Sequence, residues 1–492
     1  VGEIADEPNY EAALKALAAD VRAILGQGTR IGYGADWSEY AGHQTGAGGF
    51  LFNLDPLWAD ANIDFIGVDN YLPLADWRDG TAHLDAAIAP SIHDPAYLKA
   101  NIRGGEDYDF HYASAADRDA QRRTPISDGL GKPWLWRAKD LWGWWGNLHY
   151  DRPDGSESAV ATAWAPQLKP IWFTELGCPA IDKGANQPNV FYDPKSSESA
   201  TPYYSAATRD DLVQRRFLEA HFDFWNDAAN NPVSAVYGGP MVDAGRIHVW
   251  CWDSRPYPYF PARGDVWGDC GNYAFGHWLN GRLGAVALAD LVEALCEGFV
   301  DCDVTGLDGI VTGFAVTGTI SPRDAIAPLA TAFFFDAVER EGRIVFSMRG
   351  RGLPAPFDAD ALGLPDDGAA VSLVRAQESD LPQVSRISYI DGDHDYAQAS
   401  VESRRLTGAS NRVAVSSLPL VMDQEQAGGI GAQLLQDAWV MRESARFALP
   451  PSALALAAGD EVTLSVAGRS HRLRQTAIDD GASRAVQAIG TD

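Results

Sequence analysis

Short runs of apolar and β-branched residues alternate with longer amphipathic segments over the first 300 residues of this 492-residue chain. The short runs predict four buried strands, at residues 30–35, 63–68, 170–174 and 246–252. Apolar positions at helical spacing predict helices or helical turns at residues 9–26, 55–61, 210–228 and 285–298. Strands that alternate with helices in this way are typical of a parallel α/β architecture.

The segment 80–165 interrupts this alternation, because it is rich in loops and carries six tryptophans, so we expect it to be an insertion. Beyond about residue 300 the pattern changes to alternating and β-branched runs. These predict strands at 309–318, 343–348, 370–374, 386–390, 461–466 and 485–489. Helical spacing returns at residues 323–340 and 424–444. We therefore expect an α/β domain over residues 1–298 and a β-rich α+β region with two subdomains over residues 299–492.

The chain carries 39 basic and 67 acidic residues, which gives a net charge of −28. This excess of negative charge argues against nucleic acid or an anionic membrane surface as the main partner. The five cysteines form no C-x-x-C pair and match neither a zinc site nor a disulfide framework. We expect reduced thiols in a protein made in the cytoplasm. No apolar run reaches the length of a transmembrane helix, and no signal peptide is recognised. Because the first residue is Val1, we expect the chain to be a fragment or a processed product.

An acidic residue follows each of the four predicted strands, namely Asp36, Asp69, Glu175 and Asp253. In (β/α) barrels the carboxyl ends of the strands meet at one edge and form the active site. A single strand-end acid can be an ion-paired structural residue, but the recurrence of the pattern favours a carboxylate-lined catalytic site. A metal-dependent hydrolase is a weaker alternative, because histidine ligands are lacking at these strand ends, and we expect no metal and no cofactor.

Two carboxylates that face a sugar ring are sufficient for glycoside hydrolysis, one as acid/base and one as nucleophile. Aromatic rings beside them can stack on the apolar faces of sugars, and Trp37 and Trp252 stand at two of the predicted strand ends. Each tryptophan could instead pack in the core or the insertion. Tyr71 could hydrogen-bond the nucleophile, although a packing role is equally compatible with its position.

Three of the strand motifs resemble the large clan of TIM-barrel retaining glycosidases. Residues 169–177 (KPIWFTELG) resemble the seventh strand, whose Glu is the nucleophile, and residues 64–71 (DFIGVDNY) resemble the sixth. Residues 249–253 (VWCWD) resemble the eighth strand, whose Trp forms the floor of the sugar site. The resemblance implies that Glu175 is the nucleophile and that Tyr71 orients it.

Four further stretches resemble one family more closely, the TIM-barrel-like domain of the large tail-hub protein of gene transfer agents and related phages. They are residues 35–40 (ADWSEY), 73–79 (PLADWRD), 177–190 (GCPAIDKGANQPNV) and 252–256 (WDSRP). Residues 386–405 and those that follow resemble the phage-tail domain that comes next in those proteins. The implied fold is a TIM-barrel-like (β/α) domain over residues 1–298, followed by β-rich α+β tail-hub domains.

In that family the acid/base Glu ends the fourth strand, in a Gly-Ser-Glu-Leu setting. Residues 1–4 (VGEI) stand at the corresponding place without the serine, so Glu3 is the candidate acid/base. Strands one to three of the barrel have no counterpart in this chain, and we expect either that they come from elsewhere or that the sequence is incomplete. Besides Glu175 and Glu3, the resemblance implies a substrate site formed by Trp37, Asp36, Asp69, Tyr71, Trp252 and Asp253.

The resemblance implies a tail-tip or baseplate hub component of a gene transfer agent or phage-like particle, made in the cytoplasm and assembled into the tail tip. Its barrel would cleave host cell-wall or surface glycan, such as peptidoglycan, during delivery. Its partners would be other tail and baseplate proteins, with a homotrimer as the expected assembly, no membrane segment and no required nucleic-acid contact. The alternative is a catalytically inactive barrel that serves as a glycan-binding or structural hub module.

Overall fold

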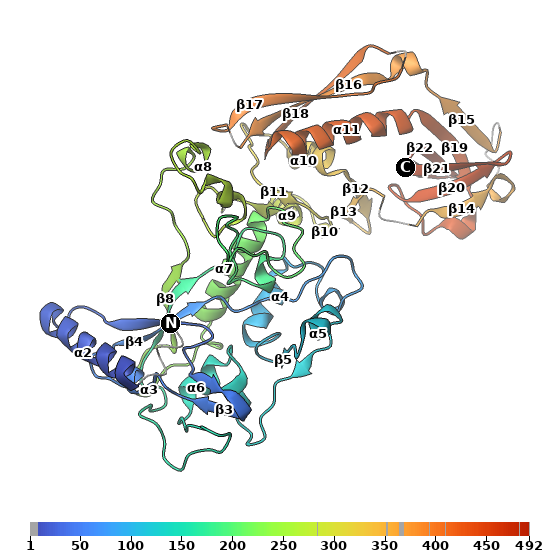
Figure 1. Cartoon of the computed structure of the whole chain (residues 1–492). Helices are drawn as coiled ribbons and strands as arrows, with labels where there is room; N and C mark the ends of the chain where they lie inside the picture. Colours follow the sequence, from blue (N-terminus) through green and yellow to red (C-terminus); the bar gives the residue numbers. More distant parts are fainter. Residues whose placement is uncertain are drawn as a thin grey trace. The chain divides into compact units, whose positions relative to one another are not determined.

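The computed structural model describes residues 8–282, 284–350, 353–363, 369–392, 394–408, 410–481 and 483–491. The chain divides into two compact units, Val1–Leu283 and Gly284–Asp492 (Figure 1). The sequence analysis placed the domain boundary at residue 298, further along the chain. Helix α9 (Leu288–Cys296) belongs to the second unit, because Leu288 and Val292 are buried in the core of that unit.

The first unit is built on a four-stranded parallel sheet. Its strands, in order, are β1 (Gly32–Asp36), β4 (Phe65–Asn70), β7 (Ile171–Leu176) and β8 (Val242–Val249). All four predicted strands are therefore strands of one sheet. Strand β8 begins four residues and ends three residues earlier than the predicted range 246–252. Within the described residues the sheet does not close into a barrel, because β1 and β8 each pair with a single neighbour.

One face of this sheet carries the core of the first unit. Ile66, Val68, Ile171 and Phe173 are each at most 1% exposed. Since successive side chains of a strand point to opposite faces, these alternate residues share one face. The helices of this unit are α2 (Pro8–Leu25), α3 (Asp55–Trp58), α4 (Pro95–Ala100), α5 (Ala115–Asp119), α6 (Leu141–Gly146), α7 (Asp211–Asn226) and α8 (Tyr259–Ala262). Two short hairpins complete it, β2 (His43–Thr45) with β3 (Gly49–Leu51) and β5 (Phe110–His111) with β6 (Thr124–Pro125).

The opposite face of the sheet is open within the described residues. A Cβ atom on Gly34 would lie 3.2 Å from the Thr174 hydroxyl oxygen, and the guanidinium of Arg246 lies 5.0 Å above the ring of Trp172. These residues therefore share this second face. Arg246 and Gly34 are exposed, and Trp172 and Thr174 are only partly buried. In a closed barrel, side chains on such a face fill the interior.

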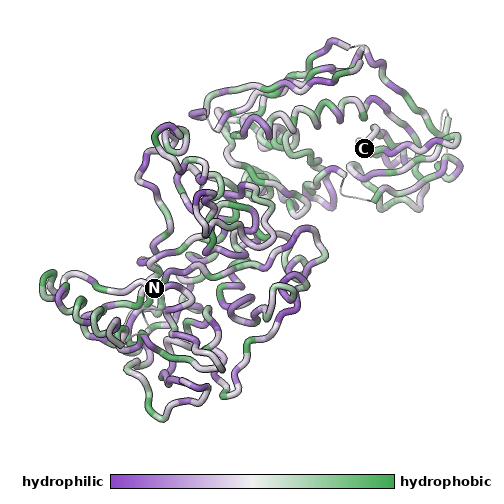
Figure 2. Tube along the Cα trace, in the orientation of Figure 1, coloured by the Kyte–Doolittle hydropathy of each residue, from purple (hydrophilic) through white to green (hydrophobic). Residues whose placement is uncertain are grey.

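Helix α2 buries only part of its predicted apolar stripe. Leu14 and Ala18 pack against the core, whereas Leu17 is 57% exposed and Ile24 is 80% exposed. Apolar and polar residues alternate along this helix in Figure 2. The helix therefore presents an apolar surface that no described residue covers.

The tryptophan-rich segment 80–165 contributes to the same core instead of forming a separate body. Trp144 and Trp164 are each 1% exposed and lie with Trp58 in the core of the first unit. Because its aromatic side chains fill this core, the segment is a structural part of the first unit.

Among its described residues the second unit has a small cluster of Leu381, Leu435 and Trp439 and two large hydrophobic cores. One lies between helices α9, α10 (Pro322–Phe333) and α11 (Gln424–Val440) and two three-stranded sheets, with α11 lying across one of the sheets (Figure 1). These sheets have the orders β10 (Cys302–Gly306), β13 (Arg343–Met348), β12 (Phe335–Arg340) and β17 (Ala397–Arg404), β16 (Pro382–Asp391), β18 (Arg412–Met422). The strands β9 (Val286–Ala287) and β11 (Ile310–Val311) form a short antiparallel pair.

The other core of the second unit lies on a six-stranded sheet. Its strands, in order, are β14 (Ala355–Asp358), β20 (Glu461–Val466), β21 (Arg469–Asp480), β22 (Arg484–Gly490), β19 (Glu443–Leu449) and β15 (Val371–Arg375).

Two predicted elements of the second unit were wrong in extent. The helix predicted at 323–340 ends at Phe333, because Phe334 adopts a left-handed backbone with φ of 55°. Residues 335–340 then pair along their whole length with β13, in a hairpin that turns at Glu341 and Gly342, so hydrogen bonds between strands replace the helical ones. The strand predicted at 309–318 is reduced to the two residues of β11.

Candidate functional site at the carboxyl ends of the strands

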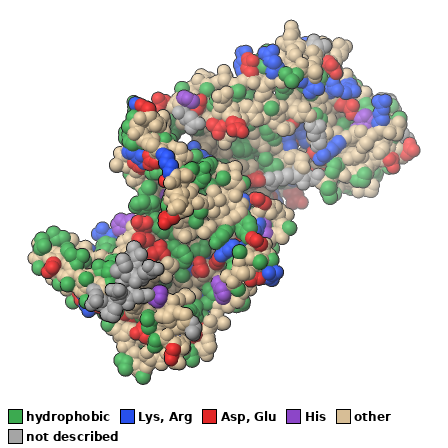
Figure 3. Space-filling model, in the orientation of Figure 1, with side chains coloured by type: hydrophobic (Ala, Val, Ile, Leu, Met, Phe, Trp, Pro, Cys, Tyr) green, Lys and Arg blue, Asp and Glu red, His purple; other side chains and the backbone are tan. Residues whose placement is uncertain are grey.

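The structure brings three of the predicted acids together at one edge of the parallel sheet. Asp36 is the register partner of Asp69, and Asp69 is the register partner of Glu175. Neighbouring strands lie about 4.8 Å apart, so the three carboxylates stand side by side along the edge. On the face shown in Figure 3, acidic side chains gather among hydrophobic ones in the first unit.

A bulge in β7 positions two of the polar side chains. Val68 pairs with Phe173 and the next residue, Asp69, pairs with Glu175, so Thr174 is the additional residue on β7. A bulge redirects the side chains around it and is common beside active sites. Here Thr174 faces Asp69 across the strands and Glu175 remains at the end of its own strand.

Each carboxylate accepts hydrogen bonds from neutral donors. The hydroxyl of Tyr71 donates to Oε2 of Glu175 at 2.6 Å, and the hydroxyl of Thr174 donates to Oδ1 of Asp69 at 2.7 Å. The backbone N–H and the hydroxyl of Ser38 donate to Oδ1 of Asp36 at 2.9 and 2.6 Å. These bonds hold the carboxylates in fixed positions without neutralising their charge.

The electrostatic environment raises the pKa of two of these acids. Burial raises the pKa of Glu175, the negative charges of Asp69 and Asp36 add to this, and the hydrogen bond from Tyr71 acts in the opposite direction. Burial also raises the pKa of Asp69, with a further contribution from Asp36 and an opposing one from Thr174. The pKa of the Tyr71 phenol is raised as well, by burial first, so Tyr71 stays a neutral donor. Carboxylates with raised pKa values that share one site are typical of acid/base chemistry.

Asp253 stands apart from this group in its chemistry. Arg255 engages both of its oxygens, with Nε at 3.0 Å from Oδ1 and 2.9 Å from Oδ2. This pairing lowers the pKa of Asp253, whereas the pKa values of Asp69 and Glu175 are raised. Arg255 also contacts Asp269, so Asp253 belongs to an ion-pair network after β8.

The two predicted sugar platforms differ in exposure. Trp252 is 70% exposed, so its ring is available to a ligand. Trp37 is partly buried and packs against the core, and its backbone N–H donates to the carbonyl of Asp69 at 3.1 Å. The structure therefore gives Trp37 a packing contact at the strand ends in addition to any contact with a ligand.

The sequence analysis missed two residues beside the acids. Trp250 donates its backbone N–H to the carbonyl of Leu176 at 2.8 Å, which extends the pairing of β7 with β8, and its side chain is 48% exposed. Burial first, and then the charges of Asp253 and Glu175, raise the pKa of Cys251 to about 11. The motif at 249–253 contained both residues, but the sequence alone did not show which of its tryptophans adjoins β7.

Glu3, the candidate acid/base, lies outside the described residues. Among the residues that the structure does describe, no group of three or more His, Cys, Asp or Glu side chains could hold a metal ion. In the same part of the chain, none of the helices combines the length and the apolar composition that a membrane span requires.

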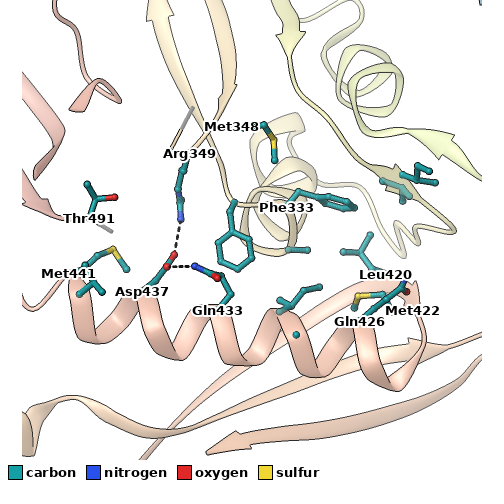
Figure 4. Close-up of a pocket in the computed structure, with 18 of the residues that line it drawn as sticks. Phe333, Met348, Arg349, Leu420, Met422, Gln426, Gln433, Asp437, Met441 and Thr491 are labelled. Carbon is teal, nitrogen blue, oxygen red and sulfur yellow. Dashed lines mark hydrogen bonds and ion pairs between the residues drawn. The ribbon is translucent and has the colours of Figure 1, made fainter. Parts of the chain in front are cut away.

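A second candidate site is a cavity of about 650 Å³ in the second unit (Figure 4). Three of the four methionines of the chain line it, namely Met348, Met422 and Met441. In Figure 4, Asp437 on α11 faces Arg349, at 3.9 Å. Flexible methionines combined with a few polar groups are typical of surfaces that accept apolar groups of varied shape. Since the lining comes from α10, β13, β18 and α11, no local motif could have predicted the cavity.

Residues 5–261 match the protein family described as the GTA TIM-barrel-like domain, which is more than half of the chain. The chain belongs to this family. Residues 321–478 match a second family, described as putative phage tail protein. The protein is therefore related to the tails of phages and gene transfer agents, as the resemblance in the sequence had indicated.

Several solved structures are similar to parts of the chain. A chain from the virion of a native gene transfer agent particle is 32% identical, with a TM-score of 0.43, and the match covers 49% of this chain and 53% of that one. This chain thus spans about half the length of that relative. The 43 kDa tail protein of prophage MuSo2 from Shewanella oneidensis is 14% identical, with a TM-score of 0.29 and coverage of 42% and 67%. The tail protein from Neisseria meningitidis is 10% identical, with a TM-score of 0.32 and coverage of 42% and 68%. Comparison with curated proteins gave no match.

Proposed function

We propose that the protein is a tail-tip or baseplate hub component of a gene transfer agent or phage-like particle whose barrel hydrolyses host cell-wall or surface glycan. The observation that carries this proposal is the 2.6 Å hydrogen bond from Tyr71 to Glu175 at the carboxyl end of the sheet, with Asp69 in register beside it. A retaining glycosidase needs a carboxylate nucleophile in a fixed orientation, and this hydrogen bond fixes the orientation of Glu175.

The proposal includes further strands that complete the barrel. Three features support it: the open face of the sheet, the unpaired edges of β1 and β8, and the exposed Leu17 and Ile24 of α2. Exposed sheet edges and apolar helix faces are normally covered in the assembled protein. Strands one to three of the family's barrel would cover them, and Glu3 is the candidate acid/base.

In the proposed reaction Glu175 attacks the anomeric carbon while an acid protonates the leaving oxygen, and water then hydrolyses the glycosyl ester. The two carboxylates of a retaining enzyme lie about 5–5.5 Å apart. Glu3 is the first candidate for the acid. Asp69 is the alternative, because it stands one strand away from Glu175 and its pKa is raised, as a general acid requires.

The raised pKa of Glu175 bears on its role as nucleophile, because a nucleophile must be ionised. The hydrogen bond from Tyr71 acts in the required direction, since it favours the charged form of Glu175. A cationic or further hydrogen-bonding group in the completed barrel would act in the same direction. Trp252 and Trp37 would serve as sugar platforms beside these carboxylates.

The decisive experiment is an assay for reducing ends released from purified peptidoglycan and from surface glycan. The wild-type protein is compared with Glu175→Gln and with a control variant, Glu219→Gln. Glu219 is a partly exposed residue of α7 that pairs with Arg215 and Arg216, so its substitution should leave activity unchanged. The proposal predicts loss of release only in Glu175→Gln. Equal release by the wild type and Glu175→Gln, or no release by the wild type in the assembled particle, would contradict it.

The acid/base is identified by parallel variants. Glu3→Gln should abolish hydrolysis of glycosides with poor leaving groups and spare activated aryl glycosides if Glu3 is the acid. Asp69→Asn should show this pattern instead if Asp69 has that role. A fluorinated activated sugar should accumulate covalently on Glu175, and peptide mass spectrometry of the adduct locates it.

The second candidate function is a glycan-binding or structural hub module, favoured by the exposed ring of Trp252 and by the ion pairing of Asp253 with Arg255. In that case the wild type and Glu175→Gln bind glycan equally and neither releases reducing ends. Light scattering of the purified protein tests the proposed homotrimer, and pull-down with tail proteins of the same particle tests the proposed partners.

A further inference from the structure

Two cysteines of the second unit lie together in the fold, outside the carboxylate site. Cys296 is the last residue of α9 and Cys302 is the first residue of β10. Cys296 is 2% exposed, and Cys302 is partly buried against the same core. The helix and the strand pack against each other, so the two side chains approach from neighbouring elements.

The chain between the two cysteines makes a tight reversal. The carbonyl of Cys296 accepts the backbone N–H of Phe299 at 3.0 Å and that of Val300 at 3.2 Å. Gly298 has φ of 75°, in the left-handed region where a glycine commonly ends a helix. The start of β10 is fixed in turn by its pairing with β13, where Cys302 is the register partner of Ile344.

This arrangement places the two cysteines close enough for their thiols to interact. The pKa of Cys296 is raised to about 11, by burial first and then by the neighbouring thiol of Cys302. The other three cysteines belong to the first unit, and Cys178 there is fully buried with its thiol 3.9 Å from the carbonyl of Val213.

We propose that Cys296 and Cys302 form an intramolecular disulfide when the protein meets an oxidising environment, and that this bond ties the end of α9 to the start of β10. The packing of α9 on β10 and the fixed reversal of the chain bring the two cysteines together from neighbouring elements, as a disulfide requires. The inference stands on these contacts and not on the proposed glycosidase activity. It does bear on delivery, because a particle that leaves the reducing cytoplasm would acquire the bond.

Oxidation by glutathione disulfide balances in two exchange steps. The more accessible thiolate of Cys302 attacks one sulfur of glutathione disulfide, which forms a mixed disulfide and releases one glutathione thiolate. Cys296 then loses its proton and attacks Sγ of Cys302, which releases the second glutathione. Two protein thiols are oxidised to one disulfide, and one glutathione disulfide is reduced to two glutathione molecules.

The test uses the purified, reduced chain treated with glutathione disulfide and then with an alkylating reagent. Trypsin cleaves after Arg282 and Arg323, so the peptide of residues 283–323 contains both cysteines and no other. The proposal predicts that this peptide loses two hydrogens, carries no alkyl group, and regains two alkylated thiols after reduction. Two alkylated cysteines, a stable glutathione adduct or a link between chains in the wild type would overturn it.

Variants separate the two thiols. Cys296→Ser should retain one glutathione on Cys302. In Cys302→Ser, the buried thiol of Cys296 should react with the alkylating reagent only after the protein is unfolded. If Cys296→Ser does not fold, Cys296→Ala keeps a small apolar group at this buried position. The control Cys270→Ser should form the same cross-link as the wild type.

A second measurement addresses the structural effect of the bond. A disulfide restricts the unfolded chain, and for a short loop in a unit of this size the Tm should rise by about 5 °C on oxidation. The rise should be absent in Cys302→Ser and present in Cys270→Ser. An unchanged Tm with the cross-link present would overturn the claim that the bond ties α9 to β10.

Discussion

At the scale of single residues, the site is a row of acids that the described residues leave without a cation. No salt bridge involving Asp36, Asp69 or Glu175 is formed within the described part of the chain, and their hydrogen bonds come from Ser38, Thr174 and Tyr71. Neutral donors orient a carboxylate without lowering its pKa as far as an arginine would. This is the physical difference between Glu175 and Asp253.

The first prediction concerns Tyr71→Phe, which removes the hydrogen bond to Oε2 of Glu175. Because that bond favours the charged carboxylate, its loss should raise the pKa of Glu175 further. An NMR titration of labelled glutamate carboxyl groups measures the change. Tyr237→Phe is the control, since that hydroxyl donates to the carbonyl of Pro240 and contacts no carboxylate. A lower or unchanged pKa of Glu175 in Tyr71→Phe would show that the bond does not stabilise the charge.

The second prediction concerns stability and pH at Asp69. Its folded pKa is raised above its ordinary value of 3.8, so between the two values the folded state binds the proton more tightly than the unfolded state. Stability therefore falls as the pH rises through this window, and the loss is complete above the folded pKa. Asp69→Asn, which keeps an acceptor for Thr174, should be more stable than the wild type at pH 7 and equally stable below pH 3.8.

Urea denaturation at both pH values measures this effect. Asp128→Asn is the control, and at pH 7 its stability should change in the opposite direction. Burial raises the pKa of Asp128, but the hydrogen bonds from Arg152, the backbone of Lys132 and Trp136 together outweigh it and lower the pKa to about 2. Its contribution to stability is present above its ordinary value and is lost as the pH falls through about 2. Asp128→Asn should therefore be less stable than the wild type at pH 7. Destabilisation by Asp69→Asn at pH 7 would contradict the sign argued here.

At the scale of secondary structure, local periodicity predicted the strands well and their boundaries less well. In the runs that predicted β1, β4 and β7, alternate apolar residues face the core, so their pattern reflects burial on one face of the sheet. The helix predicted at 323–340 failed beyond Phe333, because the hairpin of β12 with β13, which turns at Glu341 and Gly342, was not recognised in the sequence.

Arg22 shows how one buried cation holds an element in place. Its guanidinium donates to the carbonyls of Gly26 at 3.1 Å, Thr29 at 2.6 Å and Asn62 at 3.0 Å, and it pairs with Asp64. The end of α2 is thereby joined to the turn after it and to the segment that leads into β4. The Arg22 side chain is buried and these hydrogen bonds are partly buried, so losing the donor leaves several acceptors without that partner.

The third prediction is that Arg22→Met lowers the free energy of unfolding by about 2–4 kcal/mol. On the same helix, Lys15→Ala removes an exposed pair with Glu11 at 3.3 Å and should cost less than about 0.5 kcal/mol. Denaturant titration of both variants measures the difference. Equal effects of the two substitutions would mean that the contacts of Arg22 do not anchor α2.

At the scale of the whole molecule, the chain consists of two units with separate hydrophobic cores. Fifteen of the sixteen tryptophans lie in residues 1–283, and Trp439 is the remaining one. Tryptophan fluorescence therefore reports almost entirely on the first unit, whereas the β-sheet signal in circular dichroism also reports on the second.

The fourth prediction is that the chain unfolds in two transitions, because each unit has its own core. Fluorescence and circular dichroism should give different midpoints in thermal or urea unfolding. A fragment of residues 284–492 should fold alone and reproduce one of the two midpoints. Coincident midpoints by both probes would show that the units unfold as one.

The sequence by itself determined the family, the parallel strands and the acids at their ends, because strand periodicity and short motifs depend on neighbouring residues. Only the tertiary structure decided which acids act together. Arg255 pairs with Asp253 two residues away and joins it to Asp269. The bulge that places Thr174 against Asp69 depends on the register of β7 with β4, and Cys296 approaches Cys302 because α9 packs on β10. Such contacts depend on register and on chain reversal, so a local pattern can suggest the residues but cannot pair them.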